Sequence, residues 1–175
     1  GALAERIALP AGICVDTPDG MAPEIAAGFI VSYCTALYGF QDCGALQPGE
    51  NVLVLGAGGS VGVPAVDVAR AMGARVIAAA SSPEKRAAAL AQGAAAAIDY
   101  SLPDWRKELA AVMDGRGVDV VYDPVGGPFS ETAFRCLAPK GRHLVIGFAA
   151  GEIPKLPLNL ALLKRASLVG VDWGG

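Results

Sequence analysis

The chain has 175 residues, a length that predicts one domain, with a fragment of another at most. Hydrophobic residues make up 53% and charged residues 18%, so the composition excludes an intrinsically disordered chain and supplies apolar surface for a core. The formal net charge is -3 and no run of lysine and arginine occurs, so nucleic acid is not an expected partner.

The cysteines and the N-terminus bear on the compartment of the protein. The four cysteines are widely spaced and form no C-x-x-C pair. The N-terminus lacks the positive region and hydrophobic core of a signal peptide. We therefore expect reduced thiols in a cytoplasmic protein.

Residues 1–48 read as a lead-in to the rest of the chain. We expect a short apolar strand near Ile7–Leu9 and a turn at Asp16–Gly20. No charged residue occurs in Ile25–Gln41, a length that approaches a membrane span of about 20 residues. Because this segment contains several hydroxyl side chains and two glycines, and is bracketed by Glu24 and Asp42, we predict a buried helix and no membrane span.

From residue 49 onward, apolar runs alternate with helical patterns. The alternation predicts βαβ crossovers and a parallel sheet with helices on both faces. Six strands fit the doubly wound α/β order 3-2-1-4-5-6 of a Rossmann sheet. The expected strands are Val52–Leu55, Arg75–Ala79, Ala97–Asp99, Val118–Tyr122, Leu144–Ile146 and Ser167–Val171, and the expected helices are Ser60–Met72, Glu84–Gln92, Asp104–Met113, Phe129–Leu137 and Leu158–Lys164.

A glycine-rich segment follows the first expected strand. A strict G-x-G-x-x-G spacing that starts at Gly56 fails, but G-x-x-G-x-x-G fits through Gly56, Gly59 and Gly62. Glycine allows a tight turn and a close backbone approach to a pyrophosphate, and the helix that begins near Ser60 would offer free N–H groups. A plain tight turn would use the same residues. The strand before, the helix after and the βαβ frame favour a dinucleotide cofactor.

The end of the second expected strand indicates which dinucleotide. NAD-binding chains place an acidic residue there, about 20 residues after the glycine loop, to hold the ribose hydroxyls. This chain has Ala80, Ser81 and Ser82 instead, followed by Lys85 and Arg86. An acid would repel a 2′-phosphate, whereas small hydroxyl residues with a nearby cation accept one, so we predict NADPH. Alternatively, Ser82 only caps the next helix and the two cations are solvated.

Seven stretches spread over nearly the whole chain carry a family resemblance: 46–50, 56–62, 93–94, 98–100, 117–126, 141–148 and 168–174. They resemble the medium-chain dehydrogenase/reductase superfamily and, within it, the zinc-free quinone oxidoreductase (NADPH:quinone reductase) branch. Members of that family combine a GroES-like catalytic domain with a Rossmann cofactor domain inserted into it. The resemblance implies that residues 1–18 are a remnant of the catalytic domain, 19–48 a linking helix and 49–175 the Rossmann NAD(P)-binding domain.

The resemblance also implies which residues hold the cofactor. Those that would cradle the pyrophosphate are Gly58, Gly59, Ser60 and Val61. Those that would surround the adenosine ribose and its 2′-phosphate are Ser81, Lys85 and Tyr100. Those that would lie beside the nicotinamide half are Val125, Gly126, Gly147, Phe148 and Ala149. Thr35, on the linking helix, would face the cofactor. Two alternatives stay open: Tyr100 as a buried ring, and Asp123 as a residue that only shapes a turn before a proline.

Neither a metal nor a catalytic side chain is expected in this chain. Zinc-dependent relatives carry a cysteine ligand four residues before the threonine that Thr35 matches, and this chain has Val31 there. Cys34 and Cys43 have neither a histidine partner nor the spacing of a tetrahedral site. His143, the single histidine, lies in a strand pattern, so we assign no catalytic role to it.

The resemblance implies hydride transfer from NADPH to a small acceptor, a quinone or an α,β-unsaturated carbonyl. The fragment alone should bind the cofactor and turn over poorly. One alternative is an enoyl-thioester reductase, such as the enoyl reductase domain of a polyketide synthase, and another is a nucleotide-binding module without turnover.

The run Ser167–Val171 contains no charge or proline that would protect an edge strand. Because family members join cofactor domains edge to edge, we predict a homodimer through this last strand.

Overall fold

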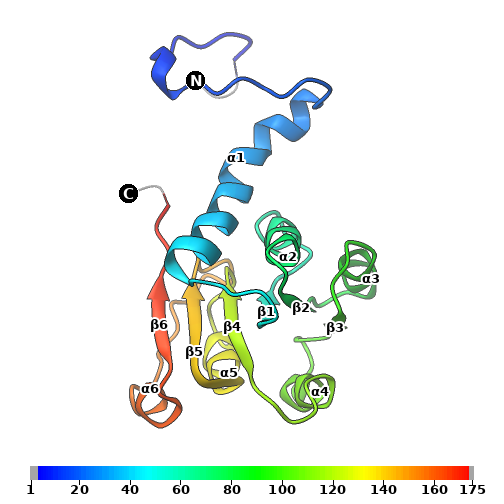
Figure 1. Cartoon of the computed structure of the whole chain (residues 1–175), viewed down its shortest axis with the longest axis vertical. Coiled ribbons are helices and arrows are strands. Elements are labelled where there is room, and N and C mark those ends of the chain that lie inside the picture. Colours follow the sequence, from blue (N-terminus) through cyan, green and yellow to red (C-terminus); the bar gives the residue numbers. More distant parts are fainter. Residues whose placement is uncertain (1–3, 174–175) are drawn as a thin grey trace.

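A computed structural model of the chain describes residues 4–173 (Figure 1). Six parallel strands form one sheet in the order β3-β2-β1-β4-β5-β6, which confirms the predicted doubly wound α/β fold. The strands are β1 (Asn51–Leu55), β2 (Arg75–Ala79), β3 (Ala96–Ile98), β4 (Val118–Asp123), β5 (Leu137–Val145) and β6 (Ser167–Gly170). The helices are α1 (Pro23–Tyr38), α2 (Gly62–Ala71), α3 (Pro83–Ala91), α4 (Trp105–Val112), α5 (Phe129–Arg135) and α6 (Asn159–Lys164), with a 3₁₀ turn at Ala11–Ile13 and a π-helical turn at Gly39–Cys43.

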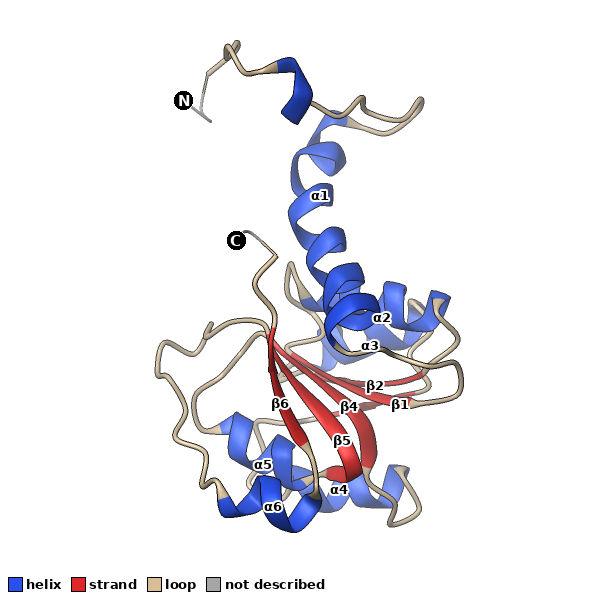
Figure 2. Ribbon diagram, turned by 60° about the vertical axis from the view of Figure 1, so that its left-hand side comes forward, coloured by secondary structure: helices blue, strands red, loops and turns tan. Residues whose placement is uncertain are grey.

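The helices form a layer on each side of the sheet. Helices α1, α2 and α3 lie on one face, and α4, α5 and α6 lie on the other (Figure 2). Val52 and Val54 of β1 belong to the core cluster on the first face, and Leu53 and Leu55 belong to the cluster on the second. Successive side chains of a strand point to opposite faces, so a strand covered on both sides needs an unbroken apolar run.

Strand β5 begins earlier than predicted, at Leu137 and not at Leu144. Pro139, Lys140 and Gly141 suggest a turn in the sequence, but here they form an irregularity inside the strand, where the register against β4 shifts and Lys140 has a φ of 68°. Helix α5 consequently ends at Arg135, before the predicted end of that helix.

Two expectations for the lead-in are wrong. No strand forms at Ile7–Leu9, where Ile7 is 59% exposed, because the described residues place no neighbouring strand beside this segment. The helix α1 is mostly exposed, and Ala36 is its single buried residue. Only the C-terminal part of α1 lies against α2 and the sheet, while its N-terminal part projects away from them (Figure 1). None of the helices within residues 4–173 has the length and hydropathy of a membrane-spanning segment.

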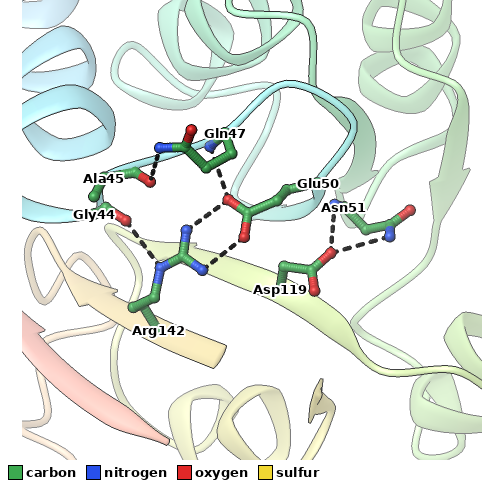
Figure 3. Close-up of polar contacts among 7 residues, drawn as sticks. All are labelled: Gly44, Ala45, Gln47, Glu50, Asn51, Asp119 and Arg142. Carbon is green, nitrogen blue, oxygen red and sulfur yellow. Dashed lines mark hydrogen bonds and ion pairs between the residues drawn. The ribbon is translucent and has the colours of Figure 1, made fainter. Parts of the chain in front are cut away.

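A cluster of polar side chains fastens the connection between α1 and β1 to the sheet (Figure 3). Arg142 of β5 forms a two-pronged ion pair with Glu50, at 2.8 and 2.6 Å, and donates to the carbonyl oxygen of Gly44 at 2.9 Å. The hydrogen bond from Arg142 holds the pKa of Glu50 below its ordinary value, against a smaller opposing effect of burial. Asp119 of β4 accepts hydrogen bonds from the backbone N–H and the side-chain amide of Asn51. These contacts fix the start of β1 against β4 and β5.

Candidate functional site

A cavity of about 430 Å³ opens where β1, β2 and β4 end. The order of strands reverses between β1 and β4, and ligands of open α/β sheets bind at such a switch point, outside the carboxyl ends of the strands. The residues that line the cavity are Gly56, Gly58, Gly59, Ser60, Val61, Gly62, Ala80, Ser81, Lys85, Tyr100, Pro124, Val125, Phe129, Ala149 and Ala150.

The glycines of the loop between β1 and α2 have different structural tasks. Gly56 has a φ of 61°, in the left-handed region that favours glycine. A Cβ atom on Gly62 would collide with the carbonyl oxygen of Gly56, so only glycine lets α2 begin this close to β1. A Cβ atom on Gly59 would meet nothing within 4 Å except that same oxygen, at 3.2 Å. Apart from that one tight contact, the space beside Gly59 is open, and Gly59 lines the cavity, where a phosphate group could approach its backbone.

The two cations after β2 differ in what they contact. Arg86 donates to the carbonyl oxygen of Ala80 at 2.9 Å and forms an ion pair with Asp99 at 2.8 Å. Lys85 forms no ion pair within the described part of the chain, is exposed, and lines the cavity beside Ser81. Lys85 is therefore the cation that can meet an anionic ligand. Ser82 caps α3 by accepting a hydrogen bond from the backbone N–H of Lys85 at 3.3 Å, so the capping interpretation also holds.

Two aromatic rings meet at the cavity. Tyr100, which follows β3, stands edge-on to Phe129 of α5, with 4.8 Å between the ring centroids. Partial burial, followed by the charges of Asp123 and Asp99, raises the pKa of Tyr100, so its phenol stays protonated at neutral pH. The sequence did not indicate Phe129 as a residue of the site, because an apolar residue at the start of a helix is indistinguishable from a core residue.

Asp123, at the end of β4, shapes the loop that follows it. Its side chain is almost fully buried, and its Oδ1 accepts hydrogen bonds from the backbone N–H groups of Val125 and Gly126 at 2.9 and 2.8 Å. Asp123 therefore shapes the turn that follows β4. The loop in turn sets the cavity wall, because the Val125 side chain lies against Gly56 and lines the cavity.

The cavity brings together many, though not all, of the residues expected to hold a cofactor. Thr35 does not line it, and its hydroxyl donates to the carbonyl oxygen of Val31 in the same helix at 2.5 Å. Gly126, Gly147 and Phe148 do not line it either, and the ring of Phe148 fills the space beside Gly126 that a Cβ atom would need. The expected residues that do line the cavity are Gly58, Gly59, Ser60, Val61, Ser81, Lys85, Tyr100, Val125 and Ala149.

Metal donors are dispersed across the molecule. No group of three or more histidine, cysteine, aspartate or glutamate residues that could hold a metal ion occurs in residues 4–173. The Nε2 atom of His143 lies 3.0 Å from Oδ2 of Asp123, within hydrogen-bond distance. The donor set that the structure describes therefore does not fit a zinc site.

Comparisons with known proteins agree on one group of enzymes. The chain is 38% identical over 175 residues to a quinone oxidoreductase-like protein 2 homolog of Nematostella vectensis, an alignment that covers 99% of the chain and 48% of that protein. The quinone oxidoreductase of Thermus thermophilus, solved also as its NADPH complex, aligns with a TM-score of 0.84 and 40% identity over 99% of this chain and 55% of that one. The chain thus spans about half the length of both.

A third similarity concerns a shorter protein. The nucleotide-binding subdomain of the enoylreductase domain of PpsC from Mycobacterium tuberculosis aligns with a TM-score of 0.72 and 35% identity, over 82% of this chain and 80% of that one. The sequence profile of the zinc-binding dehydrogenase family matches residues 60–175, well over half of the chain. The chain belongs to that family and, within the medium-chain dehydrogenase/reductase superfamily, to the cofactor-binding domain region of the quinone oxidoreductase branch.

Proposed function

We propose that the chain is the cofactor-binding part of an NADPH-dependent oxidoreductase that transfers hydride to a quinone or an α,β-unsaturated carbonyl. The observation that carries the proposal is the cavity at the switch point, where Gly59 faces open space and Lys85 is available to an anion. The NADPH complex of the Thermus thermophilus relative supports the choice of cofactor.

The residues of the cavity suit the parts of NADPH. The loop of Gly58, Gly59 and Ser60, followed by the N-terminal end of α2, would hold the pyrophosphate through backbone N–H groups. Ser81 and Lys85 would hold the 2′-phosphate of the adenosine ribose, since no acid stands at the end of β2 to repel it. Pro124, Val125 and Ala149 would form the wall beside the nicotinamide.

NADPH, when bound, supplies a hydride from its nicotinamide ring. The chain's contribution is then to hold and orient that ring and to exclude water with an apolar wall. We name no proton donor among the described residues and assign no role to zinc in what these residues do.

A titration with both cofactors tests the proposal. We expect NADPH to bind more tightly than NADH by about 1–3 kcal/mol, the usual contribution of charge-assisted contacts. Ala80→Asp should shift the preference toward NADH, and Lys85→Gln should weaken NADPH more than NADH. Lys107→Gln is a matched control, because Lys107 is an exposed lysine on α4 that pairs with Asp104. Equal affinities, or a preference for NADH, contradict the proposal.

An enoyl-thioester reductase is the second candidate, favoured by the similarity to the enoylreductase subdomain of PpsC. Both candidates use the same cofactor cavity, so the acceptor separates them. The full-length protein should be assayed with quinones and with enoyl thioesters. Reduction of enoyl thioesters alone selects the second candidate. NADPH binding without turnover of either acceptor class would indicate a nucleotide-binding module that is not an enzyme.

We also propose that the cofactor domains form a homodimer through β6. Among the described strands, β6 pairs with β5 alone, and Leu162, Leu163 and Leu168 near this edge are more than half exposed. An apolar open edge favours pairing with a second copy, which closes the ladder of hydrogen bonds. Sedimentation of the full-length protein should show a dimer at micromolar concentration that Val169→Pro disrupts. A wild-type monomer, or a dimeric proline variant, contradicts this interface.

The division of the chain follows from the same proposal. Residues 1–18 would belong to the catalytic domain, 19–48 would link the two domains, and 49–175 would form the NAD(P)-binding domain. All four cysteines are free thiols, as is usual in the cytoplasm, where we place the protein. Limited proteolysis of the full-length protein should cut near the linking segment before it cuts the sheet.

A further inference from the structure

Asp123, Ser130 and His143 form a buried polar group behind the candidate cofactor cavity. Asp123 is 2% exposed, Ser130 is 6% exposed and His143 is 1% exposed. The Oδ2 atom of Asp123 accepts a hydrogen bond from the Ser130 hydroxyl at 2.6 Å and lies 3.0 Å from Nε2 of His143. One oxygen of this carboxylate therefore holds the loop after β4, while the other is held by α5 and β5.

The protonation of the group follows from its hydrogen bonds. Burial alone would raise the pKa of Asp123, but hydrogen bonds from His143, Gly126 and Ser130 outweigh it and hold the pKa below its ordinary value. An ionised carboxylate only accepts hydrogen bonds, so Nε2 of His143 carries a proton and donates it to Asp123. The other ring nitrogen, Nδ1, is buried without a hydrogen-bond partner among the described residues. The ring thus leaves one polar atom unsatisfied while it makes the contact with Asp123.

Both segments expected beside the nicotinamide are tied to Asp123. Its backbone carbonyl oxygen accepts the N–H groups of Ile146 and Gly147, at 3.0 and 3.3 Å. The next two residues of the loop continue the pattern, since Ala149 donates to Pro124 and Ala150 donates to Val125. Residues 124–126 and 146–150 therefore form one unit, and movement of Asp123 would move both parts of the cavity wall.

We propose that His143 and Ser130 are positioning residues for the nicotinamide half of the cofactor. Their side chains fix the position of the Asp123 carboxylate. That carboxylate binds the backbone of residues 124–126, which in turn hydrogen-bond to residues 149–150, so the whole cavity wall keeps its shape. Two of the expected contacts of the adenosine half, Ser81 and Lys85, follow β2 and make no contact with this group. The third, Tyr100, packs against Phe129 and forms no hydrogen bond with Asp123, Ser130 or His143 among those of the described residues. This inference rests on the proposed function, since it assumes that NADPH occupies the cavity.

Two ligands that differ in the nicotinamide test the proposal on this chain. NADPH contains both halves of the cofactor, and 2′-phospho-ADP-ribose lacks the nicotinamide. We expect His143→Phe, which keeps a ring next to Phe134, to weaken NADPH by about 10- to 150-fold at most, the full loss of one charge-assisted hydrogen bond. Ser130→Ala should act in the same direction and is the test if the phenylalanine variant does not fold. Binding of 2′-phospho-ADP-ribose should stay within about twofold, since no contact of that half changes.

Rescue and control variants separate positioning from general destabilisation. His143→Gln should recover part of the NADPH affinity, because its amide can donate to Asp123. Leu137→Ala, a cavity-forming change in the same strand and in the core cluster that contains Phe134, should lower stability and leave the ratio of the two affinities unchanged. The ¹⁵N spectrum of the single histidine should show a proton on Nε2.

The outcomes distinguish this inference from the proposed function. Equal weakening of both ligands, unchanged affinity for both, or a proton on Nδ1 alone overturns the positioning role while the proposed function stands. A wild-type chain that binds neither ligand overturns both.

Discussion

The two halves of the sheet build their sides of the cavity by different means. On the β1–β3 side, the part of the wall that follows β1 is a backbone loop, and its shape depends on the absence of side chains at Gly56 and Gly62. On the β4–β6 side, buried side chains hold the wall, with Asp123 at the centre. A wall built from the backbone can therefore be recognised in the sequence from one short glycine-rich segment. A wall held by side chains depends on residues that lie far apart in the sequence, so no single segment reveals it.

The largest expected effect concerns the backbone-built side. Gly59→Val places a branched side chain in the open space where a pyrophosphate would approach, so we expect cofactor binding to be lost while the domain still melts cooperatively. Fluorescence titration and thermal unfolding measure the two properties. Gly62→Val is the contrasting variant, because its Cβ atom would collide with Gly56 and lower the melting temperature. If the Gly59→Val variant binds the cofactor normally, the loop is only a tight turn and does not hold the pyrophosphate.

The next effect concerns a side-chain contact that joins the two halves, between Glu50 before β1 and Arg142 of β5. Arg142→Ala removes an ion pair whose side chains are about one-fifth exposed, together with a hydrogen bond to Gly44. We expect the free energy of unfolding in urea to fall by about 1–3 kcal/mol, reduced by partial exposure to solvent. Lys107→Ala, which breaks an exposed pair, should have little effect. Equal losses in the two variants would mean that the Arg142 cluster is no stronger than a surface pair.

A pH dependence should follow from Asp123. The pKa of Asp123 is lower in the folded chain than in the unfolded chain, where it is about 3.9. Its contribution to stability is therefore complete at pH values above the unfolded-state pKa and is lost as the pH falls through the folded-state pKa. We therefore expect the wild-type chain to be more stable than Asp123→Asn at pH 7, with a gap that narrows in acid. Urea unfolding at several pH values measures the gap. A constant gap would contradict the assignment of an ionised carboxylate.

The smallest effect is a difference in thiol reactivity. Burial raises the pKa of Cys136, on the β4–β6 side, to about 11, and its side chain is almost inaccessible. Cys14 is exposed. Alkylation at pH 8 should therefore modify Cys14 long before Cys136, because the thiolate is the reactive species. Peptide mass spectrometry over time would show the order, and early modification of Cys136 would indicate that the β4–β6 half opens readily.

The comparison of the two halves also explains what could be predicted from the sequence. Strand β2 was predicted with its observed limits, and the glycine loop was placed correctly, because period and glycine spacing are local properties. The start of β5 was missed, since the irregularity at Lys140 depends on its pairing with β4. The contact between Asp123 and His143 joins residues 20 apart in the sequence, and local patterns carry no signal for it. The exposure of α1 was missed because composition does not say what covers a helix.

The two-pronged ion pair between Glu50 and Arg142 has a consequence for how the chain folds. Its two residues are 92 positions apart, so a ribosome at about 5–20 residues per second makes the second roughly 5–20 s after the first. The segment before β1 stays unfastened during that interval, although β1, α2 and β2 are already complete. In the complete chain, the contact must also close a loop of 92 residues, and this entropic cost favours its formation after the transition state for folding. Arg142→Ala should therefore accelerate unfolding and leave the folding rate nearly unchanged.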